Sequence, residues 1–356
     1  MPGPKGPHAT DTWNYPPLNA PFPRHSLAAD PRALLRELAP YRKAETGRSF
    51  FELGVTALPF ALLWATMCVA LQAGYMIALV LALPAGGFLL RLFLIQHDCG
   101  HGAFFGRQSA NDWVGRILGT MTLTPYDYWR RSHAVHHAGT GNLDARGVGD
   151  VDTLTVAEFR SRGRFGRFLY RLYRSPFVLF GVGPAYLFLL RHRLPIGMMT
   201  RGWRPWVSVM GTNAAIAAAA VAMSWMIGLE LFLLVHLPIV LVAASLGVWF
   251  FYVQHQFEHT IWDRDEDWTF HGAALHGSSY YELPGILRWL TANVGIHHVH
   301  HLASRIPFYR LHEAVRDLPV LAATSKVSMV QSFRYVRLAL WDEQKRKLVS
   351  FREVRP

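Results

Sequence analysis

The chain has 356 residues, of which 51% are hydrophobic, and a formal net charge of +12. This composition is more apolar than that of an ordinary soluble domain and less apolar than that of a bundle with little outside the bilayer, so it favours a membrane protein with a large part outside the membrane. Two cysteines exclude a disulfide framework, a thiolate zinc site and an iron–sulfur cluster, and the dispersed positive charge argues against nucleic-acid binding.

Residues 1–49 are rich in proline and polar residues and form a predicted N-terminal segment, with a short helix expected at about 30–41. Four apolar segments follow along the chain, and each is long enough to cross a bilayer: 50–72, 73–95, 206–227 and 229–253. Their very short connections predict two transmembrane hairpins, over 50–95 and 206–253. Arg91, near the end of the second segment, is expected to snorkel toward the membrane surface.

Two hairpins leave three polar stretches, 1–49, 96–205 and 254–356, on one side of the membrane. Residues 96–205 carry fifteen arginines, whereas the hairpin turns carry no lysine or arginine. The positive-inside rule therefore places the termini and both parts of a predicted cap, 96–205 and 254–356, in the cytoplasm. Anionic lipid headgroups or an acidic electron-carrier protein would suit the same charge.

Two shorter apolar stretches lie inside the first part of the cap. Phe177–Leu190 is too short for an ordinary span and contains glycine and proline, so we expect an interfacial or re-entrant helix there. Trp113–Leu123 is a second candidate of the same kind. The predicted fold is thus an all-α integral membrane protein, with four transmembrane helices in two hairpins and a cytoplasmic helical cap.

Ten histidines occur in four tight groups, all within the predicted cap or at its border with the spans. The groups are His97 and His101 in HDCGH, His133, His136 and His137 in HAVHH, His255 and His259 in HQFEH, and His297, His300 and His301 in HHVHH. Spacings of three and four residues place each group on one helix face. Because neutral imidazole is the commonest metal ligand, these ten residues predict a site for two metal ions.

The ligand type narrows the choice of metal. A catalytic zinc site needs about three protein ligands, so ten neutral imidazoles indicate a redox dimetal centre, for which iron is the usual choice in oxygen chemistry. Soluble di-iron bundles use glutamate and Glu-x-x-His instead, and that pattern is absent here.

With HDCGH, HAVHH and GIHHVHHL followed by Arg305–Pro307, the chain resembles the membrane fatty acid desaturases, a family with three histidine boxes. Boxes 1 and 2 would lie in the first part of the cap and box 3 in the second. The resemblance is closest to the acyl-lipid omega-6 (delta-12) desaturases, through TGNLD (140–144), QHQFEHT (254–260) and HGSSYYELP (276–284).

The resemblance implies that all ten box histidines bind a di-iron centre. It favours His259 over His255, so the expected catalytic set omits His255 and consists of His97, His101, His133, His136, His137, His259, His297, His300 and His301. Side chains that orient the imidazoles are expected among Asp98, Asp144, Asp150, Asp152, Glu258 and Asn293. An apolar acyl tunnel is expected beside the irons, with candidate lining residues Trp113, Tyr126, Trp129, Tyr280, Tyr281 and Trp289.

The implied reaction is O2-dependent insertion of a cis double bond into a membrane-lipid acyl chain, converting oleoyl to linoleoyl chains. Breaking an unactivated C–H bond needs a metal cofactor, with O2 as co-substrate and a separate electron donor, ferredoxin or a cytochrome b5-like protein. A membrane di-iron hydroxylase or oxygenase acting on fatty acyl, alkane or carotenoid substrates would share the same site. A non-enzymatic metal sensor or transporter would need acidic or histidine residues inside the spans, along an ion path. Apart from His236, the spans lack a set of such residues. The short length and the lack of a transit signal favour a bacterial inner membrane.

Overall fold

The computed structural model describes residues 31–147, 149–322 and 324–354; the rest of the predicted N-terminal segment, 1–30, lies outside the described residues. The predicted short helix is present as α1 (Pro31–Leu38) and the 3-10 turn η1 (Ala39–Arg42). The four predicted spans are also present, and each is helical: α2 (Thr46–Gln72), η2 with α3 (Met76–Leu81 and Ala82–Gly100), α9 (Arg204–Ile227) and α10 (Leu229–His255).

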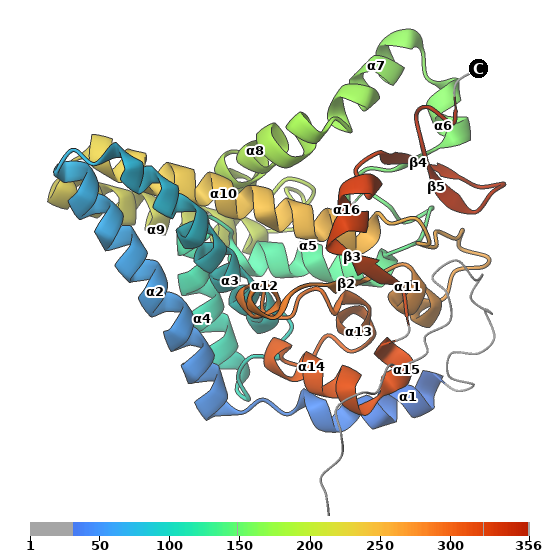
Figure 1. Cartoon of the computed structure of the whole chain (residues 1–356), viewed down its shortest axis with the longest axis horizontal. Coiled ribbons are helices and arrows are strands. Elements are labelled where there is room, and N and C mark those ends of the chain that lie inside the picture. The colour runs from blue at the N-terminus through green and yellow to red at the C-terminus, as the bar shows by residue number, and fades with distance from the viewer. Residues whose placement is uncertain (1–30, 148, 323, 355–356) are drawn as a thin grey trace, which may run out of the picture.

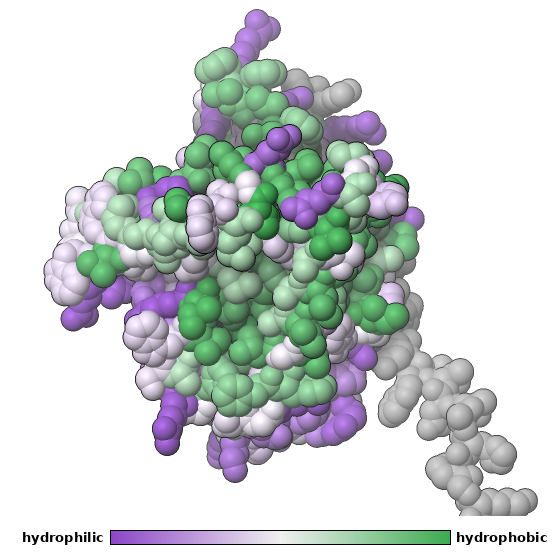
Figure 2. All heavy atoms as spheres, turned by 90° about the vertical axis from the view of Figure 1, so that its left-hand side faces the viewer, coloured by the Kyte–Doolittle hydropathy of each residue, from purple (hydrophilic) through white to green (hydrophobic). Residues whose placement is uncertain are grey.

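The spans form two hairpins whose turns lie at the same end of the molecule, on the left in Figure 1, and the cap lies at the other end. Gly74 and Gly228 form these turns with φ of +85°, a left-handed conformation that glycine adopts without strain. Figure 2 shows apolar side chains gathered over the face at the turn end, with hydrophilic side chains around its edges. The described residues before α2, between α3 and α9, and after α10 therefore emerge on one side of the spans, as the prediction of two hairpins requires.

The spans are not equivalent in burial. In the most apolar window of Met76–Gly100, 56% of the residues are buried inside the protein, against 6% for α9, so α3 is central and α9 faces outward. Arg91 does not snorkel as expected. It is 1% exposed, because its guanidinium pairs with Glu52 of α2 (Nη2–Oε2 2.5 Å) and stacks on Trp289.

Between the hairpins the chain forms the first part of the cap. Its helices are α4 (Gln108–Met121), α5 (Tyr126–Gly139), α6 (Val156–Ser161), α7 (Arg164–Tyr173), η3 (Val178–Val182), α8 (Gly183–Leu189) and η4 (Arg191–Arg193). The segment predicted as interfacial or re-entrant, 177–190, is helical and bends by 58° relative to α7. Just after this segment, Arg193 of η4 contacts α9 by donating a hydrogen bond to Asn213 (Nη1–Oδ1 2.9 Å).

The second part of the cap follows α10 and mixes short helices with short strands. The helices are α11 (Phe270–His276), α12 (Gly285–Leu290), α13 (His297–Leu302), α14 (Phe308–Asp317), α15 (Pro319–Ala322) and α16 (Met329–Tyr335). The strands, which the all-helical prediction lacked, are β2 (Tyr280–Glu282), β3 (Lys326–Ser328), β4 (Leu338–Asp342) and β5 (Lys347–Ser350) in this part, and β1 (Leu154–Thr155) in the first part of the cap.

The strands join segments that are distant in sequence. Strand β4 lies between β1, to which it is parallel, and β5, to which it is antiparallel, and β2 pairs in parallel with β3. The C-terminal residues thereby hold both the loop after α5 and the segment before α13. These two places border the histidine groups, so the small sheets fix the backbone around the site.

Candidate metal centre

Nine of the ten histidines converge in two adjacent clusters where α3, α5, α10 and α13 meet. The five-histidine cluster consists of His97, His101, His133, His137 and His300, and the four-histidine cluster consists of His136, His255, His297 and His301. Within each cluster one ring nitrogen per residue lies within 4.8 Å of all the others. The rings of His137 and His301 stack at 4.1 Å between centroids and join the two clusters.

Helices α5 and α13 each contribute to both clusters. In α5, His133 and His137 are four residues apart and share a face, whereas His136 points to the other cluster. In α13 the arrangement is reversed, since His297 and His301 enter the four-histidine cluster and His300 enters the five-histidine cluster. The HxxHH spacing thus allows one short helix to serve two sites.

The nitrogen spacings fit metal coordination. In the four-histidine cluster the Nε2 atom of His297 lies 3.0 Å from Nε2 of both His255 and His301. In the other cluster Nε2 of His137 lies 3.0 Å from that of His133 and 3.2 Å from that of His300. Imidazole nitrogens that share one metal ion at about 2.1 Å lie roughly 3.0–3.4 Å apart. A ring nitrogen has one proton or one lone pair in its plane, so hydrogen bonds explain at most one contact of each pair.

Two further observations indicate ligand atoms ready for a metal. Nε2 of His101 and Nε2 of His136 are buried and have no hydrogen-bond partner, an arrangement that a bound metal ion would relieve. Burial, reinforced by the neighbouring imidazoles, lowers the pKa of six histidines well below the usual 6.5 and keeps them neutral at pH 7: His101, His133, His137, His297, His300 and His301.

Of the six residues predicted to orient the imidazoles, Asp98 and Asp150 contact a histidine of the clusters. Asp150 Oδ1 lies 2.5 Å from His136 Nδ1, and Asp98 Oδ1 lies 3.4 Å from His97 Nδ1. The other four have different surroundings: Asp144 pairs with Arg264, Asn293 donates to the carbonyl of Phe308, and Asp152 and Glu258 are exposed. The carbonyl of Gly277, which no sequence signal identified, lies 3.3 Å from Nδ1 of His255.

His259 belongs to neither cluster, contrary to expectation. Helix α10 ends at His255, and His259 lies in the turn that follows, where its side chain is exposed. The prediction that His255 and His259 share one helix face is therefore wrong. His255, which the family resemblance ranks below His259, is buried at the end of the helix and faces His297 and His301.

Among the aromatic candidates for the acyl tunnel, Trp129 contacts the five-histidine cluster, because its ring stacks on His133 at 4.6 Å and 14°. Tyr126 is buried and donates to the carbonyl of Cys99 (2.8 Å), while Tyr281 contacts Ser332 through its hydroxyl. Trp289 packs on Arg91. Tyr280 lies against His298, and Trp113 is 65% exposed.

These features define a helical protein with four helices of membrane-spanning length and two adjacent histidine clusters that could hold metal ions. The family model described as "Fatty acid desaturase" matches residues 72–333, which is most of the chain. The chain therefore belongs to the fatty acid desaturase family, as the histidine boxes predicted, and is an oxidoreductase of that family.

Comparison with curated proteins agrees. The chain is 41% identical over 330 residues to a "Fatty acid desaturase" of Bacillus subtilis, and the match covers 93% of each protein. It is 28% identical over 272 residues to an "sn-1 acyl-lipid omega-3 desaturase (ferredoxin)" of Synechocystis, covering 72% of this chain and 69% of that protein. An endoplasmic reticulum omega-3 fatty acid desaturase of Vigna radiata is 28% identical over 66% of this chain and 63% of its own length.

Proposed function

We propose that this protein is an O2-dependent acyl-lipid desaturase with a di-iron centre, and that it inserts a cis double bond into an acyl chain of a membrane lipid. The observation that carries the proposal is the convergence of five and four imidazoles in two adjacent clusters at the end of the apolar helices. For the position of the double bond we propose omega-6, oleoyl to linoleoyl. The omega-3 position named for two relatives is the competing outcome.

The proposed metal ligands are the nine clustered histidines, with His255 included and His259 left out. Two irons bound there would supply the electron transfer to dioxygen that C–H cleavage requires. The overall change is –CH2–CH2– plus O2, two electrons and two protons, giving –CH=CH– and two water molecules. The side chains and backbone of the protein would hold the imidazole nitrogens in position for the metal ions, and would hold one carbon pair of the acyl chain beside the clusters.

The place of the clusters suits a substrate that stays in the bilayer. His97 lies in the last turn of α3 and His255 ends α10, the helices of the two most apolar spans, so a lipid acyl chain could reach the clusters without leaving the membrane region. Trp129, stacked on His133 and in edge contact with Phe93 at 5.5 Å, is the aromatic side chain that we propose to border the reacting carbons. Its flat apolar ring would exclude water on that side.

Electrons must come from a separate carrier, and we propose a ferredoxin, as the names of two relatives state for those proteins, or a cytochrome b5-like protein. The arginine-rich cap would suit an acidic donor. By the positive-inside rule we propose that the cap lies in the cytoplasm. For the membrane we propose a bacterial inner membrane.

The test is the fatty acid profile of a host that contains oleoyl lipids and co-expresses a ferredoxin with its reductase. We expect a new diunsaturated C18 acid from the wild type and from His259→Ala, and none from His301→Ala. Mass spectrometry of derivatised products gives the position of the bond. A double bond elsewhere overturns the omega-6 assignment, and a hydroxylated product or no product from the iron-loaded protein overturns desaturation.

A further inference from the structure

We propose that Asp150 is a positioning residue that aims His136 into the four-histidine cluster, so that the metal affinity of this cluster depends on the loop residues 140–147 and 149–153. The inference rests on the proposed metal centre and goes beyond it, because it assigns to a residue outside the histidine boxes the control of one of the two sites. Three features of the structure support it.

The first feature is the contact itself. Asp150 Oδ1 lies 2.5 Å from Nδ1 of His136, whose side chain is fully buried, while that of Asp150 is 11% exposed. A carboxylate accepts a hydrogen bond and cannot donate one, so the imidazole proton must be on Nδ1. Nε2 of His136 then carries the lone pair, and this is the buried atom that has no hydrogen-bond partner. The carboxylate thus selects the tautomer that a metal needs.

The second feature is the close approach of the loop to helix α5. Gly149 has a φ of +77°, and a Cβ atom built on it would lie 3.3 Å from Cβ of His136. Both the conformation and the space favour glycine at this position. The backbone therefore passes directly against the histidine, which brings the short side chain of Asp150 within reach.

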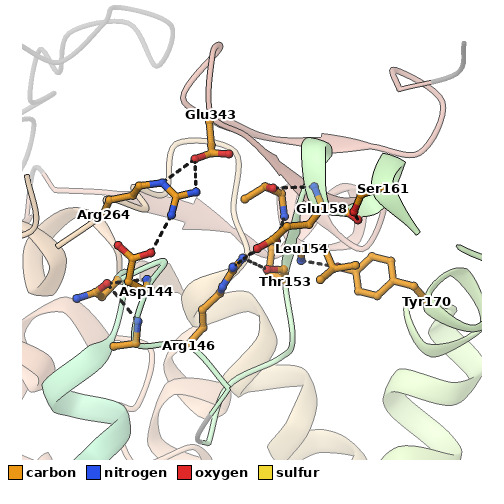
Figure 3. A network of polar contacts seen from close by, with 12 residues as sticks. Asp144, Arg146, Thr153, Leu154, Glu158, Ser161, Tyr170, Arg264 and Glu343 are labelled. Atoms are coloured by element: carbon orange, nitrogen blue, oxygen red, sulfur yellow. Dashed lines mark hydrogen bonds and ion pairs between the residues drawn. The ribbon is translucent and has the colours of Figure 1, made fainter. Parts of the chain in front are cut away.

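The third feature is a set of tethers on the loop that carries Asp150, and Figure 3 shows them. Arg146, before Asp150, donates to the carbonyl of Thr153, after it (2.8 Å), and pairs with Glu158 in the first turn of α6, so it joins the two flanks. Asp144, also before Asp150, accepts a hydrogen bond from Arg264 (2.8 Å). Arg264 also pairs with Glu343 in the turn between β4 and β5, so the loop is fixed to two distant parts of the cap.

The five-histidine cluster has a weaker contact of this kind. Asp98 Oδ1 lies 3.4 Å from Nδ1 of His97, and its other oxygen accepts the backbone N–H of Phe308 at 2.6 Å. Loss of the Asp150 carboxylate should therefore weaken one cluster and leave the other unchanged. A role in general packing would instead affect both.

The experiment is a Co2+ titration of the metal-free, full-length protein in detergent, followed by the visible absorption of bound cobalt. We expect two equivalents to bind to the wild type. In Asp150→Asn we expect one phase to weaken by about 10–100-fold while the other stays unchanged. Asp152→Asn is the matched control, because this acid lies two residues further on the same loop and contacts none of the clustered histidines; we expect both phases to remain.

The outcomes separate the two proposals. A wild type that binds fewer than two equivalents overturns the proposed metal centre, and the inference with it. Two tight equivalents in Asp150→Asn overturn the positioning role alone. The unchanged phase reports that the variant is folded; if both phases are lost, Asp150→Glu is titrated, and loss of both phases there as well shows a folding role and overturns the site-specific one.

Discussion

The buried ion pair between α2 and α3 gives a prediction whose size follows from its contacts. Arg91 and Glu52 are each 1% exposed. Besides Glu52, the guanidinium donates to Thr56 Oγ1 (2.9 Å) and to the carbonyl of Trp289, and it lies 4.3 Å from the Trp289 ring centroid. Replacing Arg91 by Met leaves the buried carboxylate of Glu52 and the carbonyl of Trp289 without these donors. Glu52 keeps one partner, the half-exposed Arg48 (2.7 Å).

Removing one partner of a buried ion pair costs about 3–5 kcal/mol, and because Arg48 remains we expect about 3 kcal/mol for Arg91→Met. The double variant Glu52→Gln/Arg91→Met should be less destabilised than Arg91→Met, since no unpaired charge is left. The exposed pair Arg116–Asp127 is the control, and Asp127→Asn should cost less than about 1 kcal/mol. The assay is denaturant unfolding in detergent micelles, giving the free energy of unfolding. An Arg91→Met variant as stable as Asp127→Asn would refute the reasoning.

Three more predictions follow from the site and its surroundings. His255→Ala should retain about one of two metal ions per chain by elemental analysis, because three imidazoles bind more weakly than four, and His259→Ala should retain both; equal loss in the two would contradict the clusters. Burial lowers the pKa of His298 to about 4 and the pKa of the neighbouring cluster histidine His301 well below 6.5. Below pH 6.5 the unfolded chain therefore binds more protons than the folded chain, so the free energy of unfolding of the metal-free protein should be highest above this pH and fall as the pH is lowered. A denaturation midpoint that stays constant from pH 7.5 to 5 would disagree. Gly115→Ala should lower the melting temperature, since its Cβ would lie 2.2 Å from the ring of Tyr126, and an unchanged melting curve would show that the ring can move away.

Much of the centre could be predicted from local periodicity. The i, i+3, i+4 spacing in HAVHH and HHVHH correctly indicated helices, and both are helical. The prediction that each group lies on one face was wrong for both, because each helix divides its three histidines between the two clusters. The apolar runs also gave the spans, since hydrophobic length alone determines whether a helix can cross a bilayer. These features depend on residues close together in the chain.

The parts that could not be predicted depend on tertiary contacts. The place where α10 ends determines that His255 is buried and His259 exposed, and no glycine or proline in the sequence indicates that end. The pairing of Arg91 with Glu52 joins two helices, so the isolated segment suggested snorkelling instead. Asp150, and neither Asp144 nor Asp152, contacts a clustered histidine, because the loop that carries all three is held by Arg264, a partner more than a hundred residues away in the chain.

The order in which the chain is made has a consequence for the two clusters. Four histidines of the five-histidine cluster precede residue 138, whereas two of the four in the other cluster come from α13, after both hairpins. During synthesis from the N-terminus, the first cluster can therefore gather most of its histidines early, while the second must wait until both transmembrane hairpins have been made. A chain interrupted before residue 297 would keep four of five histidines in the first cluster and two of four in the second.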